Sequence, residues 1–138
     1  MKSPWPLLLG AWMLATLSTA GALFIGEVMR MVPCTLCWYQ RIAMFPLFVI
    51  LGMACYTNDR RGAIYAWPLA VAGALIAGYH TLFIAGWIPK TLVPCEAGVS
   101  CADQKLEILN GIPIPWLSLG AFCLITLFLS IYIKKTSK

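Results

Sequence analysis

Four long stretches without a charged residue divide the chain. They cover residues 3–26, 42–58, 62–89 and 108–133, and acidic or basic side chains bound each of them. The stretches do not alternate between apolar and polar residues, as the strands of a membrane barrel do. A helix needs about 20 apolar residues to cross the hydrocarbon core, and about 17 suffice. The pattern therefore predicts four membrane-spanning helices.

The ends of these helices are predicted from prolines, turn residues and aromatic side chains with polar tips. Pro33 suits a helix start, so the second helix should begin near Cys34. We expect a single all-α integral membrane domain, residues 1–138, folded as a four-transmembrane-helix bundle. The expected spans and the two outer segments between them are about 5–25, 38–56, 63–87 and 114–133, with outer segments at about 26–37 and 88–113.

Composition supports lipid as the solvent of this chain. Hydrophobic residues make up 61% of it and charged residues 11%, whereas soluble domains carry about 25% charged residues. The net charge of +5 is explained by membrane topology and by attraction to anionic lipid. Membrane lipid is therefore an expected partner, and nucleic acid is not.

The basic residues also predict an orientation. Four spans put both termini on one side, and the cytoplasmic side of a membrane protein is enriched in Lys and Arg. We therefore expect both termini in the cytoplasm. A cleaved signal peptide is the alternative for the first span, but that stretch stays apolar through Ile25, which is longer than a signal core needs. Six basic residues flank the spans on the terminal side and four on the other: Lys2, Arg60, Arg61, Lys134, Lys135 and Lys138 against Arg30, Arg41, Lys90 and Lys105.

This orientation sorts the six cysteines into two groups. Cys55 and Cys123 fall inside the second and fourth spans, where a free cysteine is expected to pack as a small apolar side chain. The other four map to the outward side, where disulfides persist. These candidate redox residues are Cys34, Cys37, Cys95 and Cys101.

The pair Cys34 and Cys37 falls in the first turn of the second helix. Unpaired N–H groups and the helix dipole favour negative charge there, and C-x-x-C pairs often have a lowered thiol pKa. Arg41 follows Cys37 by four residues and should lie one turn further on the same face, where its charge would stabilise a Cys37 thiolate. The alternative is an interfacial arginine whose side chain reaches to water.

Two further features complete the candidate chemistry. Cys95 and Cys101 are separated by five residues, and this turn-prone pair is either a relay disulfide, a static staple or unbonded. His80 precedes Trp87 by seven residues, which places it about 10 Å below the outer end of the third helix. An ionisable group at that depth marks a proton or substrate path, or is a neutral histidine bonded across helices.

The stretch Cys34-Thr35-Leu36-Cys37-Trp38-Tyr39-Gln40-Arg41 resembles the signature of the DsbB/BdbC family of bacterial thiol oxidases. His80-Thr81 and Pro113-Ile114-Pro115-Trp116-Leu117 match the family as well. The resemblance covers nearly the whole chain and is closest to the Bacillus-type BdbC members. It implies a protein-disulfide:quinone oxidoreductase of the bacterial cell membrane that supports disulfide formation in exported proteins.

The resemblance also implies an electron route. A reduced extracytoplasmic partner with a thioredoxin fold, DsbA-like or BdbD-like, attacks a Cys95–Cys101 disulfide at Cys95. Cys101 then attacks the Cys34–Cys37 disulfide at Cys34 and leaves Cys37 as a thiolate. Better-known DsbB members have a longer stretch between the loop cysteines, so the roles of Cys95 and Cys101 are open to exchange.

The acceptor that the resemblance implies is a membrane quinone, either menaquinone or ubiquinone. Its expected binding residues are Cys37, Arg41 and His80, and no resident metal is expected. Three alternatives remain: an all-thiolate zinc site of the four outward cysteines, a vitamin K epoxide reductase-like protein, and a scaffold with structural disulfides. In the second, C-x-x-C follows the loop cysteines, whereas here it precedes them.

Overall fold

The computed structural model describes residues 3–30, 34–89, 107–108 and 112–138. Within these residues, four helices are long and apolar enough to cross a membrane, which confirms the expected fold class. A two-residue antiparallel pair, β1 (Glu107–Ile108) and β2 (Ile112–Pro113), precedes the last helix. The helices are α1 (Trp5–Leu23), which continues as the π-helical turn η1 (Phe24–Val28), α2 (Thr35–Thr57), α3 (Arg60–Ile84) and α4 (Ile114–Thr136).

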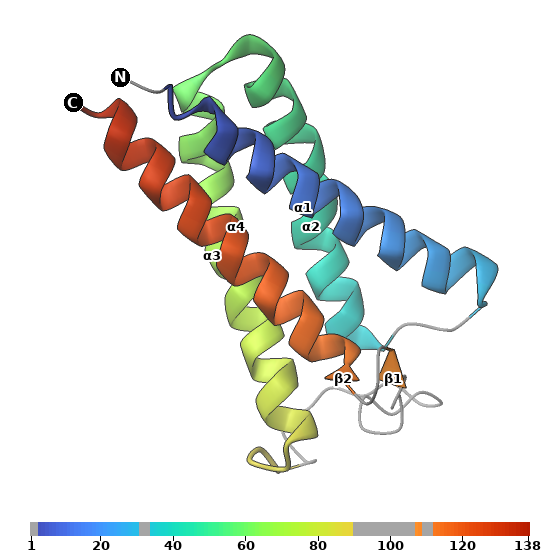
Figure 1. Cartoon of the computed structure of the whole chain (residues 1–138). Helices are drawn as coiled ribbons and strands as arrows, with labels where there is room; N and C mark the ends of the chain where they lie inside the picture. The colour runs from blue at the N-terminus through green and yellow to red at the C-terminus, as the bar shows by residue number, and fades with distance from the viewer. Residues whose placement is uncertain (1–2, 31–33, 90–106, 109–111) are drawn as a thin grey trace.

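The four helices form a closed ring in which each packs against two others. α2 lies between α1 and α3, and α4 contacts both α3 and α1 (Figure 1). Trp5 Nε1 donates to the Cys55 carbonyl at 3.2 Å, and Arg60 Nε donates to Thr136 Oγ1 at 3.2 Å. These contacts join the starts of α1 and α3 to the ends of α2 and α4. Both chain termini therefore lie at one end of the bundle.

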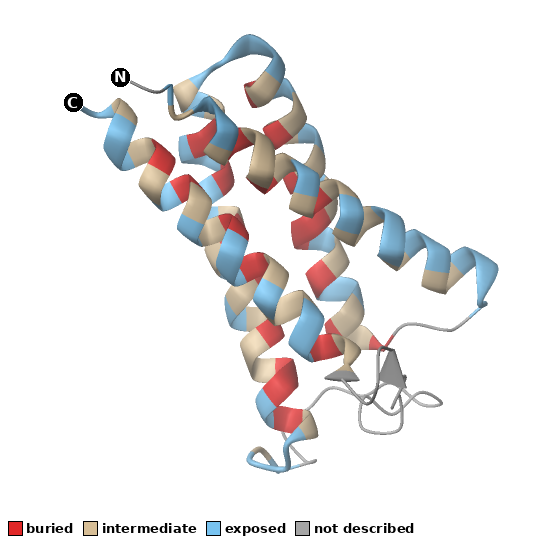
Figure 2. Cartoon of the chain, in the orientation of Figure 1, coloured by how far each residue is buried: buried red, intermediate tan, exposed pale blue. Residues whose placement is uncertain are grey.

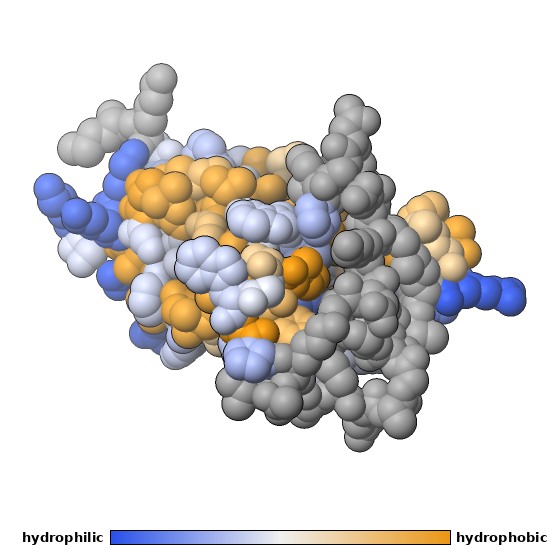
Figure 3. All heavy atoms as spheres, turned by 90° about the horizontal axis from the view of Figure 1, so that it is seen from below, coloured by the Kyte–Doolittle hydropathy of each residue, from blue (hydrophilic) through white to orange (hydrophobic). Residues whose placement is uncertain are grey.

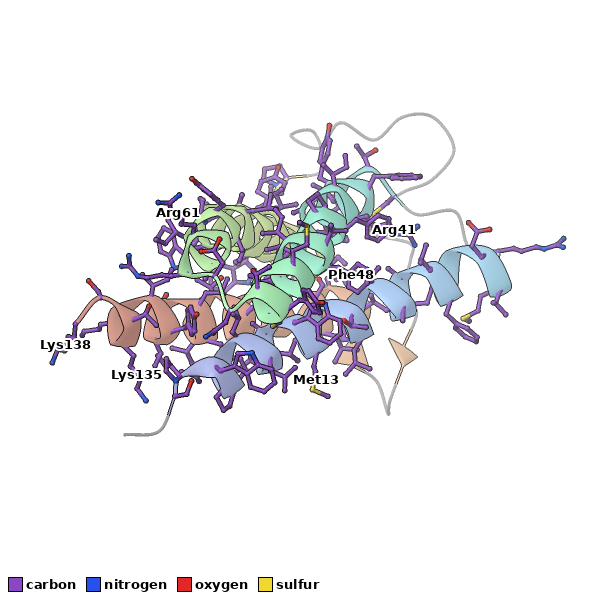
Figure 4. All side chains as sticks on the ribbon, turned by 90° about the horizontal axis from the view of Figure 1, so that it is seen from above. Met13, Arg41, Phe48, Arg61, Lys135 and Lys138 are labelled. Atoms are coloured by element: carbon purple, nitrogen blue, oxygen red, sulfur yellow. The ribbon has the colours of Figure 1, made fainter. Side chains whose placement is uncertain are left out.

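Basic side chains gather at this terminal end. Arg61, Lys135 and Lys138 lie there together in Figure 4. The two prolines at the start of α4 and the Cys34 end of α2 lie at the opposite end (Figure 1). The helix connectivity thus separates the basic cluster from the C-x-x-C motif by the length of a helix.

Small residues on α3 allow its neighbours to approach closely. A Cβ added at Gly73 would collide with the ring of Phe122 on α4, and both residues are buried. Such close approach is how membrane helices gain packing contacts where lipid is as apolar as the side chains themselves. The buried small residues of α3 recur at helical spacing: Ala63, Ala66, Ala70, Gly73 and Ala77.

The outer surface of the bundle is apolar, as a lipid-facing surface must be. Large hydrophobic side chains stand exposed along all four helices, and an exposed apolar area of this extent would be unstable in water. Figure 3 shows apolar and weakly polar residues over most of the described surface at the C-x-x-C end. Examples from the four helices are Leu17, Met53, Leu75 and Leu127.

The last third of α1 leaves the bundle. The buried residues of α1 end at Ala15, and beyond this point the helix leans away from its neighbours (Figures 1 and 2). It then continues through the π-helical turn to Val28, where we expected an outer segment from residue 26, and Arg30 takes a left-handed conformation with φ of 50°. This departing end carries the backbone that Arg41 of α2 contacts.

The other helix ends follow local rules. Asn58 takes a left-handed conformation that terminates α2, and the Asp59 side chain accepts a hydrogen bond from the Arg61 N–H at the start of α3. This tight connection supplies the inner turn between the second and third spans. It also keeps α2 and α3 adjacent along their lengths, which brings His80 of α3 to the first turns of α2.

Candidate active site

Cys34 and Cys37 lie at the first turn of α2. Cys34 is the N-cap residue in an extended conformation, and its carbonyl accepts a hydrogen bond from the Trp38 N–H. One turn of helix brings the two sulfurs to 3.1 Å, with the Cys34 thiol donating to the Cys37 sulfur. Cys34 is 1% exposed and Cys37 is half-buried. The pair is therefore asymmetric, with one sulfur enclosed by protein and one partly accessible.

The enclosed sulfur faces the third helix. His80 is 2% exposed, and its Nε2 lies 3.9 Å from the Cys34 sulfur. Cys34 also packs with Leu36 and Phe83 in a small apolar cluster separate from the main core. The Cys34 and Cys37 sulfurs and a ring nitrogen of His80 all lie within 4.8 Å of one another. The structure thus brings His80 to the dithiol, and specifically to Cys34.

Gln40 fixes the far side of the histidine ring. Its Nε2 lies 3.0 Å from His80 Nδ1, and the side chain is 8% exposed. With one ring nitrogen facing Gln40 and the other facing a sulfur, the hydrogen bond at one nitrogen determines the tautomer at the other. Gln40 was not among the residues expected at the site. Its sequence position could have indicated a role, because Gln40 lies one helical turn from Cys37 in an apolar span. An amide side chain there is costly unless it has a hydrogen-bond partner.

Arg41 is anchored on α1. Its Nη2 donates to the Ala22 carbonyl at 2.7 Å, and its Cζ lies 5.7 Å from the centre of the Trp38 ring. Gly26 leaves space for the guanidinium, because a Cβ there would lie 3.1 Å from Arg41 Nη1. Figure 4 shows Arg41 extending from α2 toward the departing end of α1. These contacts of the side chain lead to α1 and Trp38, and the expected stabilisation of a Cys37 thiolate by its charge stays a prediction.

The expected lowering of the thiol pKa does not hold for Cys34. The hydrogen bond to Cys37 and then burial raise the pKa of Cys34 from 9.0 to about 12, although the contact with His80 lowers it. The N-terminal position on the helix does not offset these two effects. In the reduced pair, Cys34 accordingly keeps its proton at neutral pH.

The remaining cysteines are placed as follows. Cys55 packs against the main core at the terminal end of α2, and Cys123 is exposed on the lipid-facing side of α4. Cys95 and Cys101, the proposed loop pair, lie outside the described residues. Within the expected outer segment at about 88–113, Glu107–Ile108 and Ile112–Pro113 form the two short strands.

Comparison with known proteins identifies the family to which this arrangement belongs. The sequence profile described as "Disulfide bond formation protein DsbB" matches residues 2–132, nearly the whole chain. The chain belongs to the DsbB family. Membership implies membrane disulfide oxidation by a disulfide oxidoreductase, and it agrees with the four spanning helices. It also sets aside the zinc-site, scaffold and vitamin K epoxide reductase-like alternatives as descriptions of the whole protein.

Individual relatives in the DsbB family carry matching names. The chain is 48% identical to a "Probable disulfide formation protein" of Metapseudomonas resinovorans, over 96% of this chain and 93% of that protein. It is 38% identical to "Disulfide bond formation protein C" of Bacillus subtilis, over 94% of each chain. A "Probable disulfide formation protein" of Coxiella burnetii is 36% identical over 86% of this chain and 82% of its own length. No solved structure matches the chain.

Proposed function

We propose that this DsbB-family protein oxidises an extracytoplasmic thiol-disulfide oxidoreductase of the DsbA or BdbD kind and passes the electrons to a membrane quinone. The observation that carries the proposal is the Cys34–Cys37 pair, with sulfurs 3.1 Å apart at the end of a membrane-spanning helix. Two sulfurs at this separation form a disulfide after a small approach, because the bond itself is about 2.05 Å long.

The route from the partner begins at the loop cysteines. A partner thiolate attacks the Cys95–Cys101 disulfide at Cys95, which forms a mixed disulfide and releases Cys101 as a thiolate. Cys101 attacks Cys34 in the Cys34–Cys37 disulfide, so that a Cys34–Cys101 bond forms and Cys37 leaves as a thiolate. The second partner thiolate then attacks the mixed disulfide, which releases the oxidised partner and frees Cys95 as a thiolate. Cys95 attacks Cys101 in the Cys34–Cys101 bond, which re-forms the Cys95–Cys101 disulfide and leaves Cys34 and Cys37 as the reduced pair. Two electrons have entered the protein for each partner disulfide made.

The residues beside Cys37 fit an apolar ring that carries carbonyl oxygens. Trp38 and Ile42 are 51% and 62% exposed on α2, at the depth where a lipid-soluble ring arrives. Arg41 lies against Trp38 and uses Nη2 for the Ala22 carbonyl, and a guanidinium has five N–H donors in all. These side chains are suited to hold a quinone, which supplies two-electron acceptance when it is bound.

His80 is suited to manage the proton of Cys34. Re-forming the Cys34–Cys37 disulfide from the dithiol removes two protons as well as two electrons. His80 Nε2 is 3.9 Å from the Cys34 sulfur, and a neutral imidazole nitrogen accepts a proton at that face when Nδ1 carries the other hydrogen. The Gln40 amide nitrogen faces Nδ1 as placed, and a 180° turn of the amide brings Oε1 there to accept from Nδ1–H and support that tautomer. In this scheme Arg41 helps to bind the acceptor, and His80 accepts the proton of the buried Cys34 thiol.

The proposed location is the bacterial cell membrane, with the termini in the cytoplasm and the cysteine pair on the extracytoplasmic side. The support is the gathering of basic residues at the terminal end, which is typical of the cytoplasmic side. Five of these basic residues lie in the described part of the chain: Arg60, Arg61, Lys134, Lys135 and Lys138. An outward C-x-x-C pair is also on the side where protein disulfides persist.

The test is a turnover assay with the purified protein in lipid nanodiscs. Reduced DsbA-like partner and quinone are mixed with the protein, and quinone reduction is followed optically. Cys37→Ala and Cys95→Ala should each abolish turnover, and Cys123→Ala, on the lipid-facing side of α4, should leave it unchanged. Normal turnover by either of the first two variants would overturn the mechanism. Parallel assays with menaquinone and ubiquinone identify the acceptor.

A further inference from the structure

The reduced site presents a set of metal ligands. Cys34 Sγ lies 3.1 Å from Cys37 Sγ and 3.9 Å from His80 Nε2, and the three ligand atoms are within 4.8 Å of one another. A tetrahedral Zn²⁺ with bonds of about 2.3 Å to sulfur and about 2.05 Å to nitrogen separates two sulfurs by about 3.8 Å and a sulfur from a nitrogen by about 3.6 Å. Binding therefore needs the two sulfurs to move apart by about 0.7 Å, within the reach of a side-chain rotation.

The histidine is already oriented as a metal ligand. Ligating histidines usually bond their second ring nitrogen to a carboxylate, carbonyl or similar group, which fixes the ring and its tautomer. Gln40 Nε2 lies 3.0 Å from His80 Nδ1, and both side chains are at least 92% buried. A 180° turn of the amide places Gln40 Oε1 at Nδ1, where it accepts from Nδ1–H and leaves the Nε2 lone pair for the ion. The imidazole is therefore held beside the two sulfurs before any ion arrives.

Charge balance also suits this place in the membrane. A divalent ion with two thiolates and a neutral imidazole has no net charge, so burial at the lipid boundary carries little electrostatic cost. Thiolate and imidazole ligands select thiophilic ions such as Zn²⁺ over Mg²⁺ or Ca²⁺.

We infer that the reduced protein binds Zn²⁺ or a similar thiophilic divalent cation through Cys34, Cys37 and His80. Binding releases one proton from each thiol and moves no electrons, and a water completes the coordination. Oxidation to the disulfide removes both thiolates and therefore destroys the site. The ion is thus an inhibitor that holds the pair reduced, and it is no resident cofactor of the oxidase. The inference requires the reduced pair alone and does not depend on the acceptor.

The experiment uses Co²⁺ as a spectroscopic probe on the full-length protein in nanodiscs. A Cys95→Ser/Cys101→Ser background leaves the pair at α2 as the only outward thiols. The reduced protein should bind one equivalent of Co²⁺ with sulfur-to-cobalt charge-transfer bands in the near ultraviolet, and Zn²⁺ should displace it. Oxidising the pair, or alkylating it with iodoacetamide, should abolish the bands, and neither treatment needs a further substitution.

Substitutions then assign the ligands. His80→Phe should weaken Co²⁺ binding at least 10-fold, and Gln40→Leu should weaken it by about 10-fold through loss of ring orientation. Cys55→Ser and Cys123→Ser are matched controls and should bind as the background does. Absence of charge-transfer bands at millimolar Co²⁺, or binding that persists unchanged in His80→Phe or in the oxidised protein, would overturn the inference. Turnover of the wild-type protein that is insensitive to Zn²⁺ would also overturn it, while the proposed oxidase activity would stand.

Discussion

His80 of α3 and Gln40 of α2 are joined across the bundle by a 3.0 Å contact between the Gln40 amide and His80 Nδ1. The opposite ring nitrogen faces the Cys34 sulfur at 3.9 Å. The three side chains form a buried line from an amide through an imidazole to a thiol. A proton lost or gained by Cys34 can therefore be coupled to a histidine whose tautomer is set by its neighbour.

This line predicts that Gln40 is a positioning residue. Gln40→Leu should lower the rate of single-turnover oxidation of the Cys34–Cys37 dithiol by about 10- to 100-fold, because the imidazole loses its fixed orientation. Nitrogen-15 NMR of the imidazole reads the tautomer directly, and assignment is unambiguous because His80 is the only histidine in the sequence. We expect one tautomer in the reduced wild-type protein and a mixture in Gln40→Leu.

Thr126→Val is the control for the Gln40 variant. Its hydroxyl bonds the Phe122 carbonyl within α4, so the substitution also removes a polar group from a span but does not touch His80. Gln40→Glu should retain one tautomer, with Nδ1–H donating to the carboxylate, and should keep much of the rate. Unchanged rate and tautomer in Gln40→Leu would contradict the assigned role.

The raised pKa of Cys34 predicts how the reduced pair responds to pH. Because the pKa is about 12 in the folded protein, Cys34 should resist thiolate-specific alkylation until strongly alkaline pH. Cys37→Ala removes the largest cause and should move the midpoint down toward 9.0, whereas His80→Phe removes a contact that lowers the pKa and should move it up. The measurement is alkylation rate against pH, read by mass spectrometry, with Cys55, Cys95, Cys101 and Cys123 changed to Ser.

The same shift has a consequence for stability. A thiol whose folded pKa lies above its unfolded value holds its proton more tightly when folded, so its contribution favours the folded state below pH 9. That contribution is lost as the pH rises from 9 toward 12. In Cys37→Ala the folding stability should fall less between pH 9 and pH 12 than in the wild-type protein. A midpoint that does not move in Cys37→Ala would show that burial, and not the neighbouring sulfur, controls the thiol.

Much of the fold follows from the sequence because one signal, the uncharged stretch, is tied directly to membrane thickness. The break between the second and third spans, expected between about 56 and 63, contains the turn at Asn58–Asp59. The last turns of α1 were not predicted. We expected an outer segment from residue 26, but Phe24–Val28 continue the helix as a π-helical turn. No local residue preference marks that change of register, which accompanies the Arg41 contact from another helix.

The candidate site, like the fold, could be predicted from the sequence only in part. Cys34, Cys37 and Arg41 could be selected from a local motif, and the depth of His80 followed from helical rise. Which of these groups touch depends on how α3 is rotated against α2, and that rotation is determined by the packing of side chains from several helices. The structure brings His80 to Cys34, a contact that no local motif specifies, and the charge of Arg41 near Cys37 stays a prediction. Gln40 was missed because its role exists only once the two helices are packed.

Arg41 can be tested through its anchor as well as directly. Arg41→Ala should weaken quinone use more than formation of the mixed disulfide with the partner, since the guanidinium is proposed to serve the acceptor. Gly26→Val places side-chain atoms where the guanidinium now lies, because even a Cβ would be 3.1 Å from Nη1. This variant should raise the KM for quinone several-fold while the partner reaction proceeds.

The matched control for Gly26 is Gly21→Val on the same helix. A Cβ at Gly21 meets nothing within 4 Å, so the substitution should leave both half-reactions unchanged. The two half-reactions are separated by quenched-flow trapping of the mixed disulfide and by optical quinone reduction. Equal loss of both in Arg41→Ala and Gly26→Val would mean that Arg41 holds α1 in place and does not act on the acceptor.

Close packing of α3 against α4 gives a prediction about stability. Gly73→Val would drive a side chain into Phe122, and overpacking of this kind costs about 1–3 kcal/mol. The melting temperature in nanodiscs, followed by circular dichroism, should fall, and Phe122→Leu in the same molecule should recover part of the loss by making room. Gly120→Val on α4 is the control, because a Cβ there meets nothing within 4 Å. A Gly73→Val protein as stable as Gly120→Val would show that the two helices have room to separate, and the geometry that brings His80 to Cys34 would then not depend on this contact.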